Sequence, residues 1–245
     1  MQVQNNIIYL ESVDSTNNYA KNLINDGEVP EGTVISAGFQ TVGRGQLHNK
    51  WESEPNNNLL VSIILYPSEI RPEEQFVLSM AVSLAIKDLL EKYISGVKIK
   101  WPNDLYSGND KIAGILIENA IAGNEIVHTI AGIGLNINQE HFLSDAPNPV
   151  SLKLITGIEY KTSEVLHQLI SCLNDRYAAV LAGERKGLEK DYHSSMWRLG
   201  EWHKFRTNME TFTGQITGTD KSGCLLVRNE NGITRNYAFK EIEYL

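Results

Sequence analysis

Apolar residues along the chain recur with two periods, one typical of strands and one typical of helices. Apolar runs, continuous or alternating, predict strands at residues 7–10, 32–40, 58–66, 97–101, 111–121 and 126–133. A period near 3.6 predicts a helix that starts within residues 14–16 and stops at Gly27, and further helices at 73–93, 162–182 and 188–194. The segment 139–160 is polar, contains prolines and predicts a connection.

The pattern changes at about Gly200, where short strands and turns replace the long elements. Strands are predicted at 204–206, 211–219, 224–228 and 233–239, with turns at 220–223 and 229–232. Roughly 45 residues of this kind are typical of a small β-barrel of SH3-like size. We therefore divide the chain into a domain of residues 1–198 and a C-terminal β-domain of residues 199–245.

Composition and charge exclude several classes of protein. Hydrophobic residues make up 42% and charged residues 21%, as in a soluble globular protein. The net charge of -8 argues against a general binder of nucleic acid or anionic membranes. No signal peptide or bilayer-length apolar stretch is present, and Cys172 and Cys224 lack metal or disulfide spacing. We expect a cytoplasmic protein without nucleic-acid or membrane partners.

One polar turn stands out between two apolar runs. Pro102-Asn103-Asp104 follows the run that ends at Trp101, and Lys111 opens the next run. Proline removes a backbone donor, and asparagine and aspartate favour turns. We expect a strand, a rigid turn and a second strand that begins with a cation, so that Asp104 and Lys111 converge at one edge of a sheet. An ordinary hairpin loop would contain the same residue types.

A second polar segment, residues 40–51, contains Gly43-Arg44-Gly45. Glycines on both sides of an arginine let the backbone approach a ligand while the guanidinium binds an anion with two hydrogen bonds. The segment predicts a mobile loop, and an exposed flexible loop without function would look the same. It lacks the GxxxxGK[ST] pattern of a P-loop.

Two further features each allow a structural and a functional interpretation. Ser15 and Thr16 either cap a helix or hold an uncharged polar group of a ligand. Gly132 and Gly134, in the strand that leads to Asn136, mark either a bulge or a place where another group approaches closely.

Taken in order, these motifs resemble those of the biotin–protein ligases (biotin–acetyl-CoA-carboxylase ligases). The resemblance covers nearly the whole chain, and KWPND at 100–104 followed by KIAGILIE at 111–118 is its most specific part. It implies an α+β fold, in which a mixed β-sheet with helices on one face, of class II synthetase-like kind, precedes a C-terminal SH3-like domain. Because the Asp-Ser-Thr-Asn motif begins at Asp14, no room remains for the N-terminal helix-turn-helix of some members. We predict a ligase without repressor activity.

The resemblance implies a reaction in two steps that uses ATP and Mg²⁺. The carboxylate of biotin attacks the α-phosphorus of ATP, and a lysine of a biotin carboxyl carrier domain then attacks biotinyl-5′-AMP. Lys111 and Arg44 are the predicted catalytic cations, because charge builds on the phosphoryl oxygens. Asp104 is the third predicted catalytic residue, and it orients the incoming amine or assists Mg²⁺; we prefer the amine.

The resemblance also implies the binding residues. For ATP and the adenylate these are Arg44, Gln46, Trp51, Asn103, Lys111 and Asn136. For biotin they are Ser15, Thr16, Asn17, Gln40, Arg44, Gly45, Gln46, Lys111 and Gly114. No protein ligand is assigned to the Mg²⁺ that accompanies ATP.

One departure and two alternatives remain. The family pattern GRGRRGRxW reads GRGQLHNKW at 43–51, with fewer arginines, which leaves open how tightly the loop holds the adenylate and whether the chain is a monomer or a weak homodimer. A lipoate–protein ligase shares the fold and is the first alternative. An octanoyltransferase typically uses a cysteine nucleophile, and neither Cys172 nor Cys224 lies near the motifs, which argues against it. The presence of Lys111, Arg44 and Asp104 argues against a non-catalytic biotin-binding module.

Overall fold

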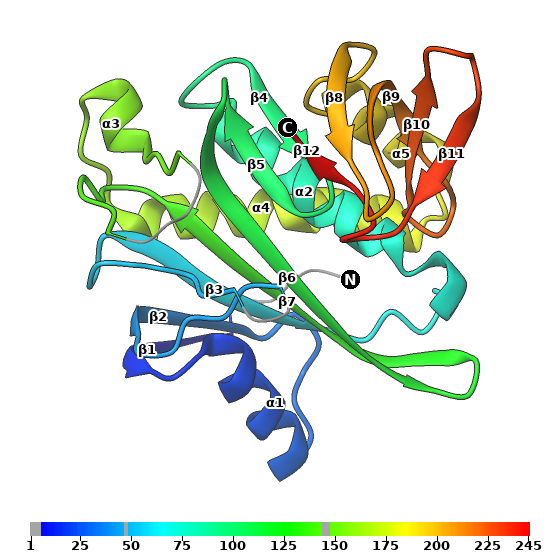
Figure 1. Ribbon diagram of the computed structural model, residues 1–245. Helices are drawn as coiled ribbons and strands as arrows, with labels where there is room; N and C mark the ends of the chain where they lie inside the picture. Colours follow the sequence, from blue (N-terminus) through cyan, green and yellow to red (C-terminus); the bar gives the residue numbers. More distant parts are fainter. Residues whose placement is uncertain (1–5, 47–48, 144–147) are drawn as a thin grey trace.

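The structure is a computed structural model that describes residues 6–46, 49–143 and 148–245. Within these residues the chain forms a large mixed sheet, a smaller antiparallel sheet and helices that cover both faces of the large one (Figure 1). The two sheets correspond to the two parts of the chain that the hydrophobic pattern distinguishes. The expected α+β fold with a small C-terminal β-domain is confirmed.

The large sheet has seven strands in the order β1-β2-β3-β7-β6-β5-β4. Only β1 and β2 pair in parallel, and every other neighbouring pair is antiparallel. The long strands β6 and β7 form a hairpin through the middle of the sheet (Figure 1). The strands are β1 (Ile7–Val13), β2 (Val34–Gln40), β3 (Asn58–Leu65), β4 (Val97–Lys100), β5 (Asp104–Ser107), β6 (Asp110–Ala122) and β7 (Glu125–Asn136).

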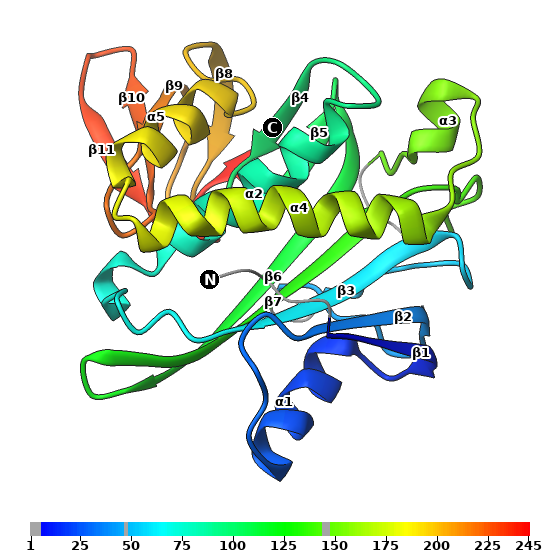
Figure 2. The same ribbon diagram turned by 180° about the vertical axis from the view of Figure 1, so that it is seen from behind.

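Three helices pack on one face of this sheet and a fourth packs on the other. The long helix α4 (Thr162–Leu181) lies across α2 (Phe76–Leu90), which lies against the sheet, and α5 (Arg185–Ser195) follows (Figure 2). Because α2 is covered by the sheet on one side and by α4 and α5 on the other, it is apolar nearly all round. On the opposite face Ala20 of α1 (Thr16–Asp26) packs with Ile35 and Ile64 in a separate core.

The small sheet is antiparallel, with the order β11-β10-β9-β8-β12. Its last strand returns towards the large sheet, so the C-terminus lies beside β4 and β5 (Figure 1). Trp101 joins the two sheets, since its Nε1 donates a hydrogen bond of 2.8 Å to the carbonyl of Gly223. The strands are β8 (Trp202–Arg206), β9 (Thr211–Thr219), β10 (Leu225–Asn229), β11 (Thr234–Tyr237) and β12 (Glu243–Tyr244).

The structure corrects three element predictions. The chain forms β5 directly after the polar turn, so the turn does not lead straight to the strand of Lys111. The segment 139–160 contains the short helix α3 (Leu152–Thr156), with Ser151 accepting a capping hydrogen bond from the N–H of Leu154. The helix predicted at 73–93 is a 3₁₀ turn (Pro72–Glu74) followed by α2, because the proline starts a separate turn.

The predicted placement of helices on one face holds for α2, α4 and α5, whereas α1 covers the other face. The division after residue 198 stays a prediction; the first strand of the small sheet begins at Trp202. None of the helices in the described part of the chain combines the length and the apolar character that crossing a membrane requires.

Candidate active site

A cavity of about 650 Å³ lies over the middle of the large sheet, within the size range of small-molecule sites. Its walls are the N-terminus of α1, residues 44–46 and 49–51, the turn 101–103 and the C-terminal segment 239–244. All predicted site residues except Asn136 line it, namely Ser15, Thr16, Asn17, Gln40, Arg44, Gly45, Gln46, Trp51, Asn103, Asp104, Lys111 and Gly114.

Glycines on β6 and β7 make the floor of the cavity flat. Gly114 and Gly134 are cross-strand partners, and a Cβ on Gly114 would lie 2.9 Å from Cζ3 of Trp51, while one on Gly134 would overlap the same indole ring. Likewise, a Cβ on Gly132 would overlap the amide of Asn17. These glycines therefore mark close approach of other groups, which was one of the two interpretations of the sequence.

Asp104 and Lys111 form an ion pair in which Nζ lies 2.7 Å from Oδ1. Both side chains come from neighbouring antiparallel strands, β5 and β6, so the predicted convergence is confirmed. They do not lie at the edge of the sheet, however, because β4 forms that edge. The backbone of Lys111 is held on its other side by hydrogen bonds to Asn148 and Val150, and its Nζ lies 5.6 Å from the ring centroid of Trp51.

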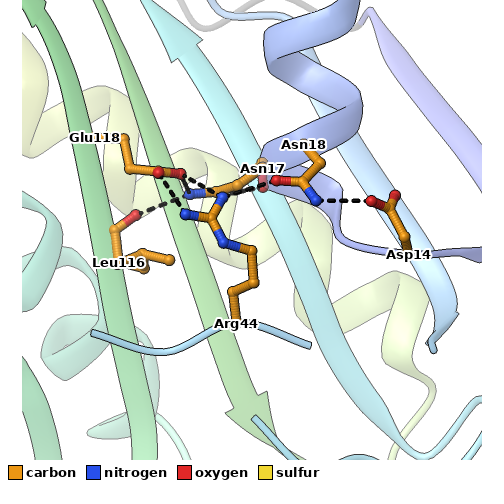
Figure 3. A network of polar contacts seen from close by, with 7 residues as sticks. Asp14, Asn17, Asn18, Arg44, Leu116 and Glu118 are labelled. Carbon is orange, nitrogen blue, oxygen red and sulfur yellow. Dashed lines mark hydrogen bonds and ion pairs between the residues drawn. The ribbon is translucent and has the colours of Figure 1, made fainter. Parts of the chain in front are cut away.

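Arg44 is the centre of a polar network that connects the 43–51 segment with α1 and β6 (Figure 3). Its Nη2 lies 2.7 Å from Oε1 of Glu118, and its Nη1 donates a hydrogen bond of 2.8 Å to Oδ1 of Asn18. Asn17 donates to the second carboxylate oxygen of Glu118 at 2.7 Å. Arg44 also forms a β-bridge with Lys50, so this part of the predicted loop folds back on itself.

The rest of the predicted loop carries two further site residues and two residues outside the described ranges. Gly45 donates its backbone N–H to the carbonyl of Asn49 at 2.8 Å. Oε1 of Gln46 is buried without a hydrogen-bond partner among the described residues. Leu47 and His48, which the mobile-loop prediction includes, lie outside the described residues.

Uncharged polar groups cluster at the end of the cavity beside α1. Oε1 of Gln40 accepts hydrogen bonds from the backbone N–H of Thr16 at 2.7 Å and from its hydroxyl at 3.0 Å. The Ser62 hydroxyl lies 2.6 Å from Oδ1 of Asn17, to which it donates. Ser15 occupies the N-cap position of α1, but its side chain makes no capping hydrogen bond. Of the two interpretations, side-chain capping by Ser15 is therefore wrong.

Two of the residues predicted to bind the nucleotide form hydrogen bonds with other parts of the protein. The side chain of Asn103 donates a hydrogen bond of 2.7 Å to the carbonyl of Ile115, which ties the polar turn to β6. Asn136 lies outside the cavity, and its Nδ2 donates a hydrogen bond of 3.0 Å to the carbonyl of Val150. Because Val150 in turn binds the backbone of Lys111, Asn136 supports the strand of Lys111 from behind.

Several lining residues were missed from the sequence because they come from the far end of the chain. Phe239, Lys240, Ile242, Glu243 and Tyr244 of the C-terminal segment border the cavity. Lys100 also borders it, although the sequence assigns it no role beyond the turn. No local pattern distinguishes residues 239–244 from an ordinary strand end, so only their contact with the turn at 101–103 reveals them.

The charges of the cavity are unbalanced in favour of cations. Its described lining contains Arg44, Lys50, Lys100, Lys111 and Lys240, but among carboxylates only Asp104 and Glu243. Asp104 is paired with Lys111, and Glu243 with Arg206 outside the cavity. A cavity with surplus positive charge attracts an anionic ligand such as a nucleotide.

The fold and the site together define a carboxylate-activating ligase, with a neutral polar end, an aromatic ring and cations around one cavity. Residues 9–136 match the biotin/lipoate A/B protein ligase family, and the chain belongs to this family. The predicted resemblance to the biotin–protein ligases is confirmed as membership of this family.

Individual relatives agree with this assignment. The chain is 30% identical over 239 residues to the bifunctional ligase/repressor BirA of Bacillus subtilis, covering 95% of this chain and 72% of that protein. It is 28% identical over 211 residues to the biotin–[acetyl-CoA-carboxylase] ligase of Paracoccus denitrificans, covering 81% and 85% of the two chains. The structure of the biotin protein ligase from Aquifex aeolicus in complex with biotin and ATP matches with a TM-score of 0.83 and 29% identity, covering 99% and 100%. These relatives favour biotin over lipoate as the acid.

Proposed function

We propose that the chain activates biotin with ATP to give biotinyl-5′-AMP and then transfers the biotinyl group to a lysine of a biotin carboxyl carrier domain. The arrangement that carries this proposal is the cavity shared by Arg44, Trp51 and the Lys111–Asp104 pair. It offers cations for phosphate, a ring for adenine and a carboxylate for an amine.

In the first step a carboxylate oxygen of biotin attacks the α-phosphorus, and the bond to the pyrophosphate oxygen breaks. Both reactants are anions, so they approach only where fixed cations offset their repulsion. Lys111 is positioned by a strand that is hydrogen-bonded on both sides, which keeps its ammonium in place for the phosphoryl oxygens. Arg44 supplies a second cation from the opposite side of the cavity floor once it releases Glu118.

In the second step the acceptor amine attacks the acyl carbon, a C–N bond forms, and AMP leaves with the electrons of the broken C–O bond. The amine must lose a proton to act as a nucleophile. Asp104 uses Oδ1 for Lys111, which leaves Oδ2 as the base that receives this proton. Enclosure by residues 44–46 and 49–51 limits hydrolysis of the anhydride by water.

The two halves of the intermediate occupy different ends of the cavity. The ureido ring of biotin binds the neutral groups of Ser15, Thr16, Asn17 and Gln40, because a neutral polar ring needs donors and acceptors without net charge. Adenine stacks on Trp51, whose indole lies on the glycine floor. Lys111 lies between the two halves, next to the phosphate.

The Mg²⁺ that accompanies ATP needs few protein ligands. The described residues contain no cluster of three or more His, Cys, Asp or Glu that would hold a metal. Mg²⁺ with a nucleotide usually binds one or two carboxylates in addition to phosphates and water. Asp104 would fit that need in the alternative to its role with the amine, and bound Mg²⁺ would neutralise part of the triphosphate charge.

Biotin-dependent exchange of radioactive pyrophosphate into ATP tests the proposal. Biotin, lipoate and octanoate are offered separately to the same enzyme preparation. Exchange with biotin alone is the expected result. Exchange with lipoate would point to the lipoate ligases of the same family, and absence of exchange with every acid would leave a non-catalytic binding module.

A further inference from the structure

Lys100 is a cation held among aromatic rings from both sheets. Its Nζ lies 4.7 Å from the ring centroid of Tyr106, 4.9 Å from that of Trp197 and 5.1 Å from that of Tyr244. It donates one hydrogen bond of 3.0 Å to the hydroxyl of Tyr106. Aromatic faces attract an ammonium without neutralising it. The rings therefore fix the position of the ammonium but leave its positive charge without a neutralising carboxylate.

The two predicted catalytic cations differ from Lys100 in this respect. Arg44 is paired with Glu118 and Lys111 with Asp104, each at 2.7 Å. Lys100 has no ion pair within 4 Å among the described residues, although it is partly buried and lines the same cavity. Burial lowers the pKa of Lys100, and the nearby Asp104 partly opposes this effect. A partly buried ammonium without a carboxylate partner is stabilised by an anion that enters the cavity.

We propose that Lys100 binds the β- and γ-phosphoryl oxygens of ATP and holds the pyrophosphate as it leaves. The inference rests on the proposed function. In that function Lys111 and Arg44 act at the α-phosphate, and Mg²⁺ would neutralise only part of the triphosphate charge, so the pyrophosphate oxygens still need a cation from the protein. The ammonium of Lys100 has three N–H groups, of which one is directed to Tyr106, and two are available for phosphoryl oxygens.

The three rings around Lys100 come from both parts of the chain, so the proposed pyrophosphate subsite depends on both. Tyr106 comes from β5, Trp197 follows α5, and Tyr244 belongs to the last strand of the small sheet. The hydroxyl of Tyr244 is buried and has no hydrogen-bond partner among the described residues. The small sheet therefore contributes to ATP binding by holding Lys100, in addition to the lining residues of its own segment 239–244.

The decisive experiment compares the two half-reactions in Lys100→Met, which keeps the aliphatic stem but removes the charge. We expect the KM for pyrophosphate and for ATP in biotin-dependent exchange to rise about 10-fold or more, the usual effect of removing a hydrogen bond to a charged group. Transfer from preformed biotinyl-5′-AMP to the acceptor involves no pyrophosphate, so its rate should stay within about twofold of the unsubstituted enzyme. Lys100→Arg keeps the charge but changes its shape, so it should restore part of the ATP affinity.

Lys98→Met is the matched control, because Lys98 lies two residues away on the same face of β4 and does not line the cavity. An unchanged KM for pyrophosphate in Lys100→Met would overturn the inference. So would an equal loss in both half-reactions, or the same loss in Lys98→Met, because each would indicate a structural effect. Failure of the unsubstituted chain to show biotin-dependent exchange would instead contradict the proposed function itself.

Discussion

Nζ of Lys111 and Oδ1 of Asp104 are 2.7 Å apart, joined across the neighbouring strands β5 and β6. Each strand also has a partner strand on its other side, and the backbone of Lys111 forms hydrogen bonds with Asn148 and Val150. In the proposed function, Lys111 is the cation for phosphoryl transfer and Asp104 the carboxylate that receives the amine proton. If the two half-reactions use different members of the pair in this way, substitutions should separate them.

Asp104→Asn should slow transfer of the biotinyl group to the acceptor lysine by about 10²-fold or more, the usual contribution of a general base. The amide keeps the shape of the side chain but cannot take a proton. The rate of transfer from purified biotinyl-5′-AMP measures this step alone. A larger loss in pyrophosphate exchange than in transfer would contradict the assignment and would favour a role of Asp104 with Mg²⁺.

Lys111→Ala should reduce biotin-dependent pyrophosphate exchange by about 10²-fold or more, because it removes a fixed cation from the charge that develops on the phosphate. Lys153→Ala is a control of the same residue type, since Lys153 pairs with Glu140 and Glu159 away from the cavity. Near-normal exchange in Lys111→Ala would refute its catalytic role.

Arg44→Ala should likewise reduce exchange by about 10²-fold or more. Its effect on stability should be small, below about 1 kcal/mol, because the Arg44 and Glu118 side chains are 38% and 37% exposed and solvent weakens their attraction. Urea unfolding followed by fluorescence measures the second quantity. Arg71→Ala, which removes a more exposed arginine paired with Glu73, is the control for both measurements. A large loss of stability with normal exchange would show that Arg44 is structural.

Gly134→Ala should raise the KM for ATP by about 10-fold, because the added methyl group overlaps the indole of Trp51 and forces it off the sheet. Gly187→Ala in α5 is the matched control, since a Cβ there meets nothing within 4 Å. The control should leave exchange unchanged and raise the free energy of unfolding by roughly 0.5–1 kcal/mol. An unchanged KM in Gly134→Ala would show that the position of Trp51 does not matter for the nucleotide.

The contact between α5 and the small sheet should weaken in acid. Nε2 of His193 accepts a hydrogen bond of 3.1 Å from the backbone N–H of Thr219, so the ring is neutral there. Burial lowers the pKa of His193 below its ordinary value of 6.5, against a smaller opposite effect of Glu189. Since the unfolded chain then binds the proton more readily, the free energy of unfolding should fall as the pH drops below 6.5.

Urea unfolding at pH 7.5 and pH 5.5 measures this dependence, since these pH values lie about one unit on either side of the ordinary pKa of histidine. His193→Gln should show a smaller decrease, and the part that remains includes His128, whose pKa burial also lowers. Equal pH dependence in the variant and the unsubstituted chain would exclude His193 as the source.

Local patterns predicted much of the fold and part of the site. The strands and the two long helices follow from apolar periods that act within a few residues. Asp104 and Lys111 could be predicted together because only a turn and one short strand separate them. That short strand was missed, since it contains four residues and follows the turn without a break in pattern. Asn136 was assigned to the nucleotide by resemblance, whereas its contact with Val150 depends on a segment that no local pattern connects with it.

By itself, the sequence determined which residue types are available and which segments form most of the strands and helices. Only the tertiary structure decided how distant segments meet. Arg44 pairs with Glu118 although 74 positions separate them, and Lys100 is surrounded by rings from three distant parts of the chain. Pairing of this kind depends on burial and on strand order, which are properties of the whole chain rather than of any short segment. The KWPND turn is thus both the predicted site of Asp104 and the place where the small sheet binds the large one.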